Sequence, residues 1–250
     1  MPSNRLQGKT IVLTGTNKTA PVKKLIEDNG GEYAVFPLIK AKELLSPEDA
    51  RWLAGLHCYD WLIFTSQNAV QTFIDKCKRA EMEVRKLDCK IASVGSRTTT
   101  LLEKHGLKVH FMPTTYSADV FVNEFPKVAE HEEKKLFLRG NLAKPTIRQG
   151  VANVTEWIIY ETCTDDSSII PLTELLQQKE VIVVFASPSA VEVFHEKIAP
   201  VVGWQQVSAA AIGHITAAAL RRHGVQVYVQ PETYTMQAVI EEIILLEEEQ

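Results

Sequence analysis

The chain has 250 residues, of which 45% are hydrophobic and 23% are charged, and its formal net charge is -4 at pH 7. This composition is ordinary for a globular protein and provides enough apolar surface for one or two cores. Without a basic excess the chain is not expected to bind nucleic acid. It also lacks the run of about 20 apolar residues that a membrane-spanning helix needs.

The cysteines are spaced without a Cys-x-x-Cys pair, at Cys58, Cys77, Cys89 and Cys163. Zinc sites and thioredoxin-like redox sites require such close pairs, so neither kind of site is expected. The first residues also lack the apolar stretch of a signal peptide. The sequence therefore predicts reduced thiols in a cytoplasmic protein that holds no metal.

Short apolar runs alternate with segments of helical periodicity along the chain. A strand over 9–14, a helix over 21–28 and a strand over 32–36 predict a right-handed parallel unit. Further strands are expected over 60–64, 91–94, 107–111, 136–140 and 157–162. Further helices are expected over 69–77 and 118–125, with another that ends at His105.

The second half of the chain repeats the first. Segment 61–73 matches segment 182–194, so that Ser66 and Ser187 are 121 positions apart. Four other pairs are each 118 positions apart: Gly95 and Gly213, His105-Gly106 and His223-Gly224, Pro113 and Pro231, and Tyr116 and Tyr234. Because these anchors keep one order with a shift of only three residues, two α/β units of similar fold are predicted.

Small polar residues occupy the turns that follow the predicted strands. Ligands of parallel sheets bind beyond the carboxyl ends of the strands, and free amides at helix N-termini attract carboxylates and phosphates. N-capping explains any single turn, but six such turns favour an anion-binding cleft. The candidate ligand-binding residues are Thr14, Gly15, Thr16, Ser66, Gly95, Ser96, Arg97, Thr98, Tyr116, Ser117, Arg139, Gly140, Asn141, Ser187, Gly213 and Thr216, with Lys144 as a further cation.

Standard motifs for catalytic and nucleotide sites are mostly absent from the sequence. It contains no GxxxxGK[ST] loop, GxGxxG turn, GxSxG elbow or HExxH pair, so no nucleotide, hydrolase or metal site is predicted. Tyr160 interrupts the pattern of small residues, because a phenol follows a strand where the first half has Pro37. Packing and ligand contact both remain open for Tyr160 on these residues alone, as does ligand contact for His214.

In combination, these residues resemble the uroporphyrinogen-III synthase family. The similarity extends over residues 8–243, and the pieces that carry it are 64–70, 94–98, 139–140, 159–162, 185–191 and 212–220. It implies an α/β fold of two similar lobes, each a parallel sheet flanked by helices, joined by a two-strand linker with crossed connectivity. Lobe one would comprise 1–37 and 164–250, the linker strands 38–40 and 161–163, and lobe two 41–160, with the substrate cleft between the lobes.

The resemblance also implies an activity. Enzymes of this family act in heme biosynthesis, where they close linear hydroxymethylbilane into a macrocycle, with loss of water and inversion of the last pyrrole ring. No cofactor is expected. Tyr160 becomes the catalytic candidate, as a hydrogen-bond donor to the departing hydroxyl, and Ser66, Thr98, Ser187 and Thr216 become cleft positions.

Some positions depart from the family pattern. Gln67-Asn68 replaces a basic residue that many members carry, and His214-Ile215 replaces a hydroxyl-rich turn, so ligand contacts there stay open. The expected protein is a monomer that at most contacts the preceding pathway enzyme transiently. Two alternatives remain, namely a bilobal anion-binding sensor without turnover and a BRCT-like interaction domain suggested by 8–16 and Gly30-Gly31.

Overall fold

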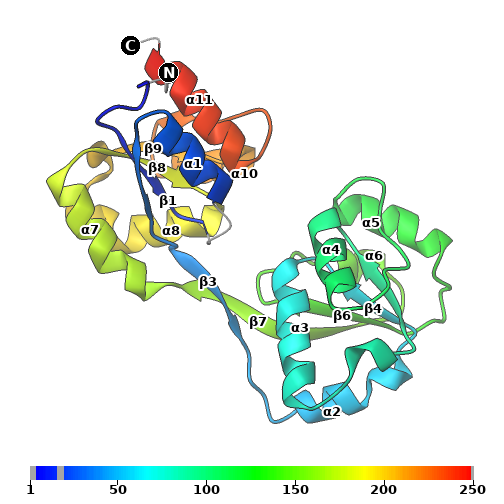
Figure 1. The fold of residues 1–250 in the computed structure, drawn as a ribbon. Coiled ribbons are helices and arrows are strands. Elements are labelled where there is room, and N and C mark those ends of the chain that lie inside the picture. The colour runs from blue at the N-terminus through cyan, green and yellow to red at the C-terminus, as the bar shows by residue number, and fades with distance from the viewer. Residues whose placement is uncertain (1–3, 16–19, 249–250) are drawn as a thin grey trace. The chain divides into compact units, whose positions relative to one another are not determined.

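The structure is a computed structural model that describes residues 4–15 and 20–248. The chain divides into two compact units: unit 1 contains Met1–Lys40 and Cys163–Gln250, and unit 2 contains Ala41–Thr162. In Figure 1 the blue N-terminal segment therefore belongs to the same unit as the yellow-to-red C-terminal part, whereas unit 2 runs from cyan to green.

Unit 1 is built on a five-stranded sheet of order β10-β9-β8-β1-β2, in which all neighbouring strands are parallel. The strands are β1 (Thr10–Leu13), β2 (Glu32–Val35), β8 (Val181–Phe185), β9 (Val207–Ala211) and β10 (Val227–Val229). The central strands β1 and β8 are buried along their whole length. This burial explains their uninterrupted apolar sequences, because a parallel sheet is covered on both faces.

Helices cover both faces of the unit 1 sheet. One apolar cluster joins the sheet to α7 (Ile169–Gln178), α8 (Pro188–Lys197) and α10 (His214–Arg222), with the short α9 (Ala199–Val202) after α8. A second cluster joins the opposite face to α1 (Ala20–Asp28) and α11 (Met236–Glu248). Unit 1 is thus a three-layer α/β sandwich.

Unit 2 has a five-stranded sheet of order β3-β7-β6-β4-β5. The strands are β3 (Ile39–Glu43), β4 (Trp61–Phe64), β5 (Lys90–Ser93), β6 (Lys135–Gly140) and β7 (Val154–Thr164), and the order from β7 to β5 is parallel. One face packs on α2 (Asp49–Ala54), α3 (Gln67–Arg79) and α4 (Ser96–Lys104). The other face packs on α5 (Ala118–Glu124) and α6 (Thr146–Gly150). Short 3-10 turns occur at Leu56–Cys58, Val84–Lys86, Phe125–Lys127, Asp166–Ser168 and Trp204–Gln206.

The two sheets share one spatial order, which confirms the repeat seen in the sequence. Strands β9, β8, β1 and β2 of unit 1 correspond in position to β5, β4, β6 and β7 of unit 2. The order along the chain differs, because β1 and β2 precede β8 and β9, whereas β6 and β7 follow β4 and β5. The chain crosses between the units within β3 and near the end of β7.

The expected strand over 107–111 is wrong. Only one parallel bridge forms there, between Ala92 and Phe111, although the repeat counterpart of this segment makes β10. The amides of His110 and Phe111 both donate to the Ile91 carbonyl, at 2.8 and 3.3 Å, so the regular alternation of a ladder is lost. The Phe111 ring instead packs on Phe121, with ring centroids 5.4 Å apart.

Glu133 ties together the first residues of β4 and β5. Its carboxylate accepts hydrogen bonds from Trp61 Nε1 at 2.8 Å, from Lys90 Nζ at 2.9 Å and from the Glu130 amide at 2.8 Å. Burial alone would raise the pKa of Glu133, but these hydrogen bonds outweigh burial and lower the pKa below its ordinary value. The carboxylate therefore stabilises the folded unit only in its charged form.

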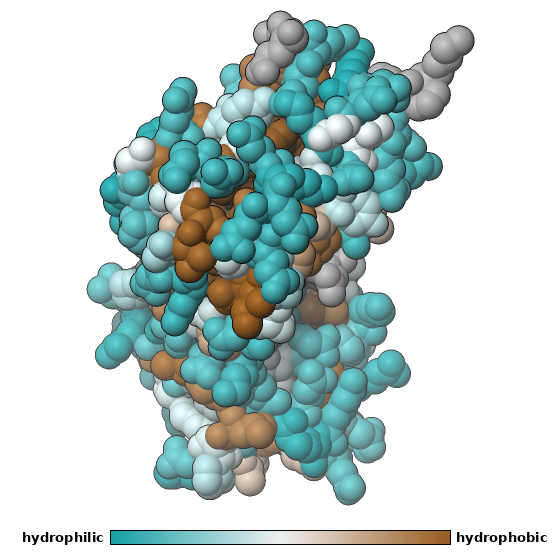
Figure 2. All heavy atoms as spheres, turned by 90° about the vertical axis from the view of Figure 1, so that its left-hand side faces the viewer, coloured by the Kyte–Doolittle hydropathy of each residue, from teal (hydrophilic) through white to brown (hydrophobic). Residues whose placement is uncertain are grey.

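The face shown in Figure 2 is largely hydrophilic, with separate apolar groups among polar side chains. Exposed apolar residues are normal on a folded protein when they do not form one large patch. Among the described residues, no helix has the length and apolar character needed to cross a membrane.

Candidate active site

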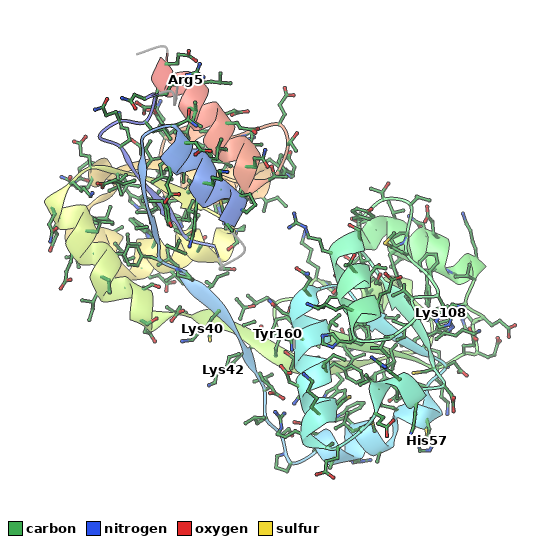
Figure 3. The ribbon with its side chains drawn as sticks, in the orientation of Figure 1. Arg5, Lys40, Lys42, His57, Lys108 and Tyr160 are labelled. Atoms are coloured by element: carbon green, nitrogen blue, oxygen red, sulfur yellow. The ribbon has the colours of Figure 1, made fainter. Side chains whose placement is uncertain are left out.

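Tyr160 of β7 and Ser66, which precedes α3, meet in unit 2. Tyr160 Oη and Ser66 Oγ lie 3.1 Å apart, within hydrogen-bonding distance. Ser66 has an extended backbone and caps α3, because its Oγ also accepts a hydrogen bond from the Ala69 amide at 3.1 Å. Figure 3 shows Tyr160 on β7 beside α3. The contact joins residues 94 positions apart.

Gly140 of β6 makes room for the Tyr160 ring. Gly140 is paired with Tyr160 of the neighbouring strand β7, and the register of the two strands shifts between Arg139 and Gly140. A Cβ atom at position 140 would lie 2.4 Å from Tyr160 Cζ and 2.8 Å from Oη, distances that real Cβ atoms do not show. The Asn141 amide donates to the Tyr160 carbonyl at 3.1 Å, and Asn141 Oδ1 accepts from the Thr162 amide at 3.0 Å. The end of β6 thus positions both the ring and the backbone of Tyr160.

The predicted turns precede helices in both units. Ser187 caps α8 by accepting a hydrogen bond from the Ala190 amide at 3.3 Å, as Ser66 does for α3. Gly95 and Gly213 are the equivalent N-cap residues of α4 and α10, both with extended backbone. The first amides of a helix have no partner within it, so these turns present hydrogen-bond donors. Thr98 and Thr216 lie buried in the first turns of α4 and α10.

Exposed tyrosines lie against the two N-cap glycines. Tyr116 is 61% exposed and Tyr234 is 55% exposed. A Cβ atom on Gly95 would lie 3.8 Å from Tyr116, and one on Gly213 would lie 2.9 Å from the Tyr234 ring. Ser117, next to Tyr116, caps α5 through the Asp119 amide at 3.2 Å. Tyr234 was not among the predicted contacts, although its repeat relation to Tyr116 was a signal for it.

A basic cavity of about 240 Å³ runs along α4. It is lined by Gln67, Ser96, Arg97, Thr100, Leu101 and Lys104. Gln67 Nε2 donates to the Arg97 carbonyl at 3.2 Å, which ties the first residues of α3 and α4 together. Arg97 was predicted as a cation for the ligand, but Lys104 was missed. Lys104 follows Arg97 by seven residues, a spacing that places both side chains on one face of a helix. This spacing could have identified Lys104 from the sequence.

Two predicted ligand-binding side chains have partners within their own units. Thr14 is fully buried, and its Oγ1 donates to the Val184 carbonyl at 2.9 Å and accepts from the Ala186 amide at 3.2 Å. The Arg139 guanidinium donates to Glu156 at 2.5 Å and to the Ala143 carbonyl at 2.8 Å. Both side chains therefore hold the fold in place, and Arg139 is not a free cation.

The other candidate residues differ in their surroundings. A Cβ atom on Gly15 would lie 3.1 Å from Ala186 Cβ, so Gly15 allows close packing of two turns. Lys144 is exposed. His214 is also exposed, with its ring centroid 5.1 Å from that of Tyr234. Thr16 lies outside the described residues.

The cysteines are free thiols in contrasting surroundings. Cys58 is exposed, whereas Cys77 is buried. Burial raises the pKa of Cys77 to about 12 and that of Cys89 to about 11, because a thiolate is poorly solvated in an apolar environment. Within the described part of the chain, no three His, Cys, Asp or Glu side chains are grouped so that they could hold a metal ion.

Comparison with known proteins places this architecture in one family. The model of the family described as "Uroporphyrinogen-III synthase HemD" matches residues 20–241. A putative uroporphyrinogen-III synthase of Methanothermobacter thermautotrophicus is 30% identical over 89% of this chain and 92% of its own length. The uroporphyrinogen-III synthase of Chlorobaculum parvum is 28% identical over 90% of this chain and 94% of its own.

Solved structures show the same fold. The uroporphyrinogen-III synthetase of Helicobacter pylori aligns with a TM-score of 0.68 at 19% identity, over 95% of this chain and 99% of its own. A mutant uroporphyrinogen III synthase of Thermus thermophilus aligns with a TM-score of 0.66 at 19% identity, over 97% of this chain and 100% of its own. The family match, the curated relatives and the shared fold agree, and the chain belongs to the uroporphyrinogen-III synthase family.

Proposed function

We propose that this protein is a uroporphyrinogen-III synthase, which closes hydroxymethylbilane into the type III macrocycle, and that Tyr160 acts at the departing hydroxyl. The observation that supports the role of Tyr160 is the position of its phenol. Gly140 leaves space that the Tyr160 ring occupies, and Ser66 Oγ lies 3.1 Å from the phenol oxygen. These two contacts hold the phenol oxygen at the N-terminus of α3.

The reaction needs a weak proton donor at the departing hydroxyl rather than a strong acid. Electrons of the terminal pyrrole expel the hydroxyl, so that a C–O bond breaks and an azafulvene forms. The Tyr160 phenol donates its proton to the departing oxygen, which leaves as water. The already substituted α-carbon of the last pyrrole then attacks the azafulvene, the bond from that carbon to its original methylene breaks, and this methylene re-bonds at the ring's other α-carbon, which inverts the ring. The proton that this second α-carbon loses on regaining aromaticity restores the phenol. The substrate supplies most of the driving force, so the protein mainly orients it.

The substrate's eight carboxylates need hydrogen-bond donors and cations. We propose that the helix N-termini provide donors in each unit, at Gly95, Ser96 and the Thr98 hydroxyl of unit 2 and at Ser187, Gly213 and Thr216 of unit 1. Amides at these ends bind anions because the helix dipole adds to their donor capacity. Arg97, in the first turn of α4, and Lys104, in its last turn, line one cavity and add positive charge along this helix. Thr14 and Arg139 are left out of this set because their polar atoms are already bonded within the fold.

Analysis of product isomers tests the proposed function. Hydroxymethylbilane is generated enzymatically and incubated with chelator-treated protein, and the type I and type III isomers are separated by chromatography. The expected product is mainly type III, because the bound chain is held in the conformation that inverts the last ring. Spontaneous closure gives type I, so a buffer control sets the background. A product that remained type I would favour the alternative, a binding protein without turnover.

A further inference from the structure

We propose that Ser66 is a positioning residue for Tyr160, whose hydroxyl donates to the phenol oxygen and so directs the phenolic proton toward the substrate. This inference rests on the proposed role of Tyr160. It replaces the expectation that Ser66 contacts substrate carboxylates.

The hydroxyl of Ser66 has one proton and two lone pairs. One lone pair accepts the hydrogen bond from the Ala69 amide at 3.1 Å, which caps α3. Its proton can then be donated to Tyr160 Oη, 3.1 Å away. Among the described residues, Ser66 Oγ is the hydrogen-bond partner of Tyr160 Oη. If the phenol donated to Ser66 instead, it would have no proton left for the departing hydroxyl.

The direction of this hydrogen bond matters when the phenol lends its proton. Negative charge develops on Tyr160 Oη as the proton moves to the departing oxygen. The hydrogen bond that Ser66 Oγ donates to Tyr160 Oη stabilises this charge. Hydrogen bonds to an ionised oxygen are shorter and stronger than those between neutral groups. Gly140 leaves the space that the Tyr160 ring occupies, so the phenol oxygen can lie 3.1 Å from Ser66 Oγ. Ser66 therefore favours the transition state more than the bound substrate.

The repeat supplies a comparison within the same molecule. Ser187 of unit 1 caps α8 through the Ala190 amide at 3.3 Å, with an extended backbone like that of Ser66. The unit 1 counterpart of the Tyr160 strand end contains Phe36 and Pro37, which have no phenol. The two serines thus share the capping role, and within the described part of the chain it is Ser66 that is hydrogen-bonded to a tyrosine hydroxyl.

Double-mutant cycles separate the two roles of Ser66. The variants are Ser66→Ala, Tyr160→Phe, Ser187→Ala and the two double variants that contain Tyr160→Phe. Ser66→Ala and Ser187→Ala should lower the melting temperature by similar amounts, because each removes one N-cap. Ser66→Ala should lower kcat by about 10- to 100-fold with little change in KM, the effect of a lost hydrogen bond to a developing charge.

The two cycles should differ. Adding Ser66→Ala to Tyr160→Phe should change kcat less than about threefold, because the two side chains act through one hydrogen bond and their effects are not additive. The effect of Ser187→Ala on kcat should be the same with Tyr160 and with Phe at position 160. Ser66→Thr retains a hydroxyl and a capping oxygen, so it should recover most of the lost kcat. If Ser66→Ala acts by the same factor in both backgrounds and mainly raises KM, Ser66 binds substrate directly and the inference is wrong.

A measurement without substrate distinguishes this inference from the proposed function. The ¹³Cζ resonance of Tyr160 reports hydrogen bonding at the phenol in a protein labelled at tyrosine. Ser66→Ala should shift this resonance and Ser187→Ala should leave it in place, whether or not the protein forms the type III isomer. If the resonance does not shift in Ser66→Ala, the hydrogen bond to the phenol is absent and the positioning role is wrong. If the wild-type protein forms no type III isomer but the resonance does shift, the proposed function is wrong and the hydrogen bond stands.

Discussion

Gly140→Ala should abolish most of the activity while the chain remains folded. The new Cβ would lie 2.4 Å from Tyr160 Cζ, and ordinary contacts begin at 3.4 Å, so the ring must move by about 1 Å. A shift of that size away from β6 disrupts the 3.1 Å contact with Ser66. Misplacement of a catalytic group by 1 Å costs about 100-fold in rate, and overpacking costs about 1–3 kcal/mol of stability.

Steady-state kinetics and thermal melting check this prediction together. The loss should appear in kcat rather than in KM, because the contact that changes is the one between the Tyr160 phenol and Ser66 and not one of the proposed carboxylate contacts. The matched control is Gly140→Ala in the Tyr160→Phe background, where no phenol remains to be misplaced and little further loss is expected. Wild-type kcat in Gly140→Ala would refute the reasoning. An equal loss in both backgrounds would show that distortion of β6, rather than of the phenol, is responsible.

Four other outcomes are expected. Tyr160→Phe should lower kcat/KM by about 10- to 150-fold with an unchanged melting temperature, because the ring packing is kept. Glu133→Gln should cost about 1–3 kcal/mol at pH 7 in chemical denaturation. The pKa of Glu133 is lowered on folding, so its contribution is present above the ordinary value of about 4.3 and is lost as pH falls through the folded value. The difference between variant and wild type should therefore shrink in acid, and a constant difference would contradict this assignment. Alkylation of the native protein should modify Cys58 and spare Cys77 until unfolding, as peptide mass mapping would show. Affinity for uroporphyrinogen III, measured by calorimetry, should fall from low to high salt, since the screening length is about 8 Å at physiological ionic strength; salt-independent binding would indicate an apolar pocket.

Local patterns in the sequence determined the class of fold, the repeat and the set of turns. Buried parallel strands read as short apolar runs, and the glycines and hydroxyl residues after them mark helix starts, so Ser66, Gly95, Ser187 and Gly213 could all be placed. Each of these features depends on neighbours within a few residues. They are visible in the sequence because steric limits and capping act over that same short range.

Contacts between distant residues were decided only by the tertiary structure. Arg139 looked like a cation for substrate until Glu156 and nearby carbonyls were found around its guanidinium. Segment 107–111 does not form a strand, because the amides of His110 and Phe111 both donate to the Ile91 carbonyl. The approach of Tyr160 to Ser66, across 94 positions, depends on the order β7-β6-β4 in the sheet and on the glycine in β6. Sheet order and side-chain partners arise from packing the whole unit, so no local pattern encodes them.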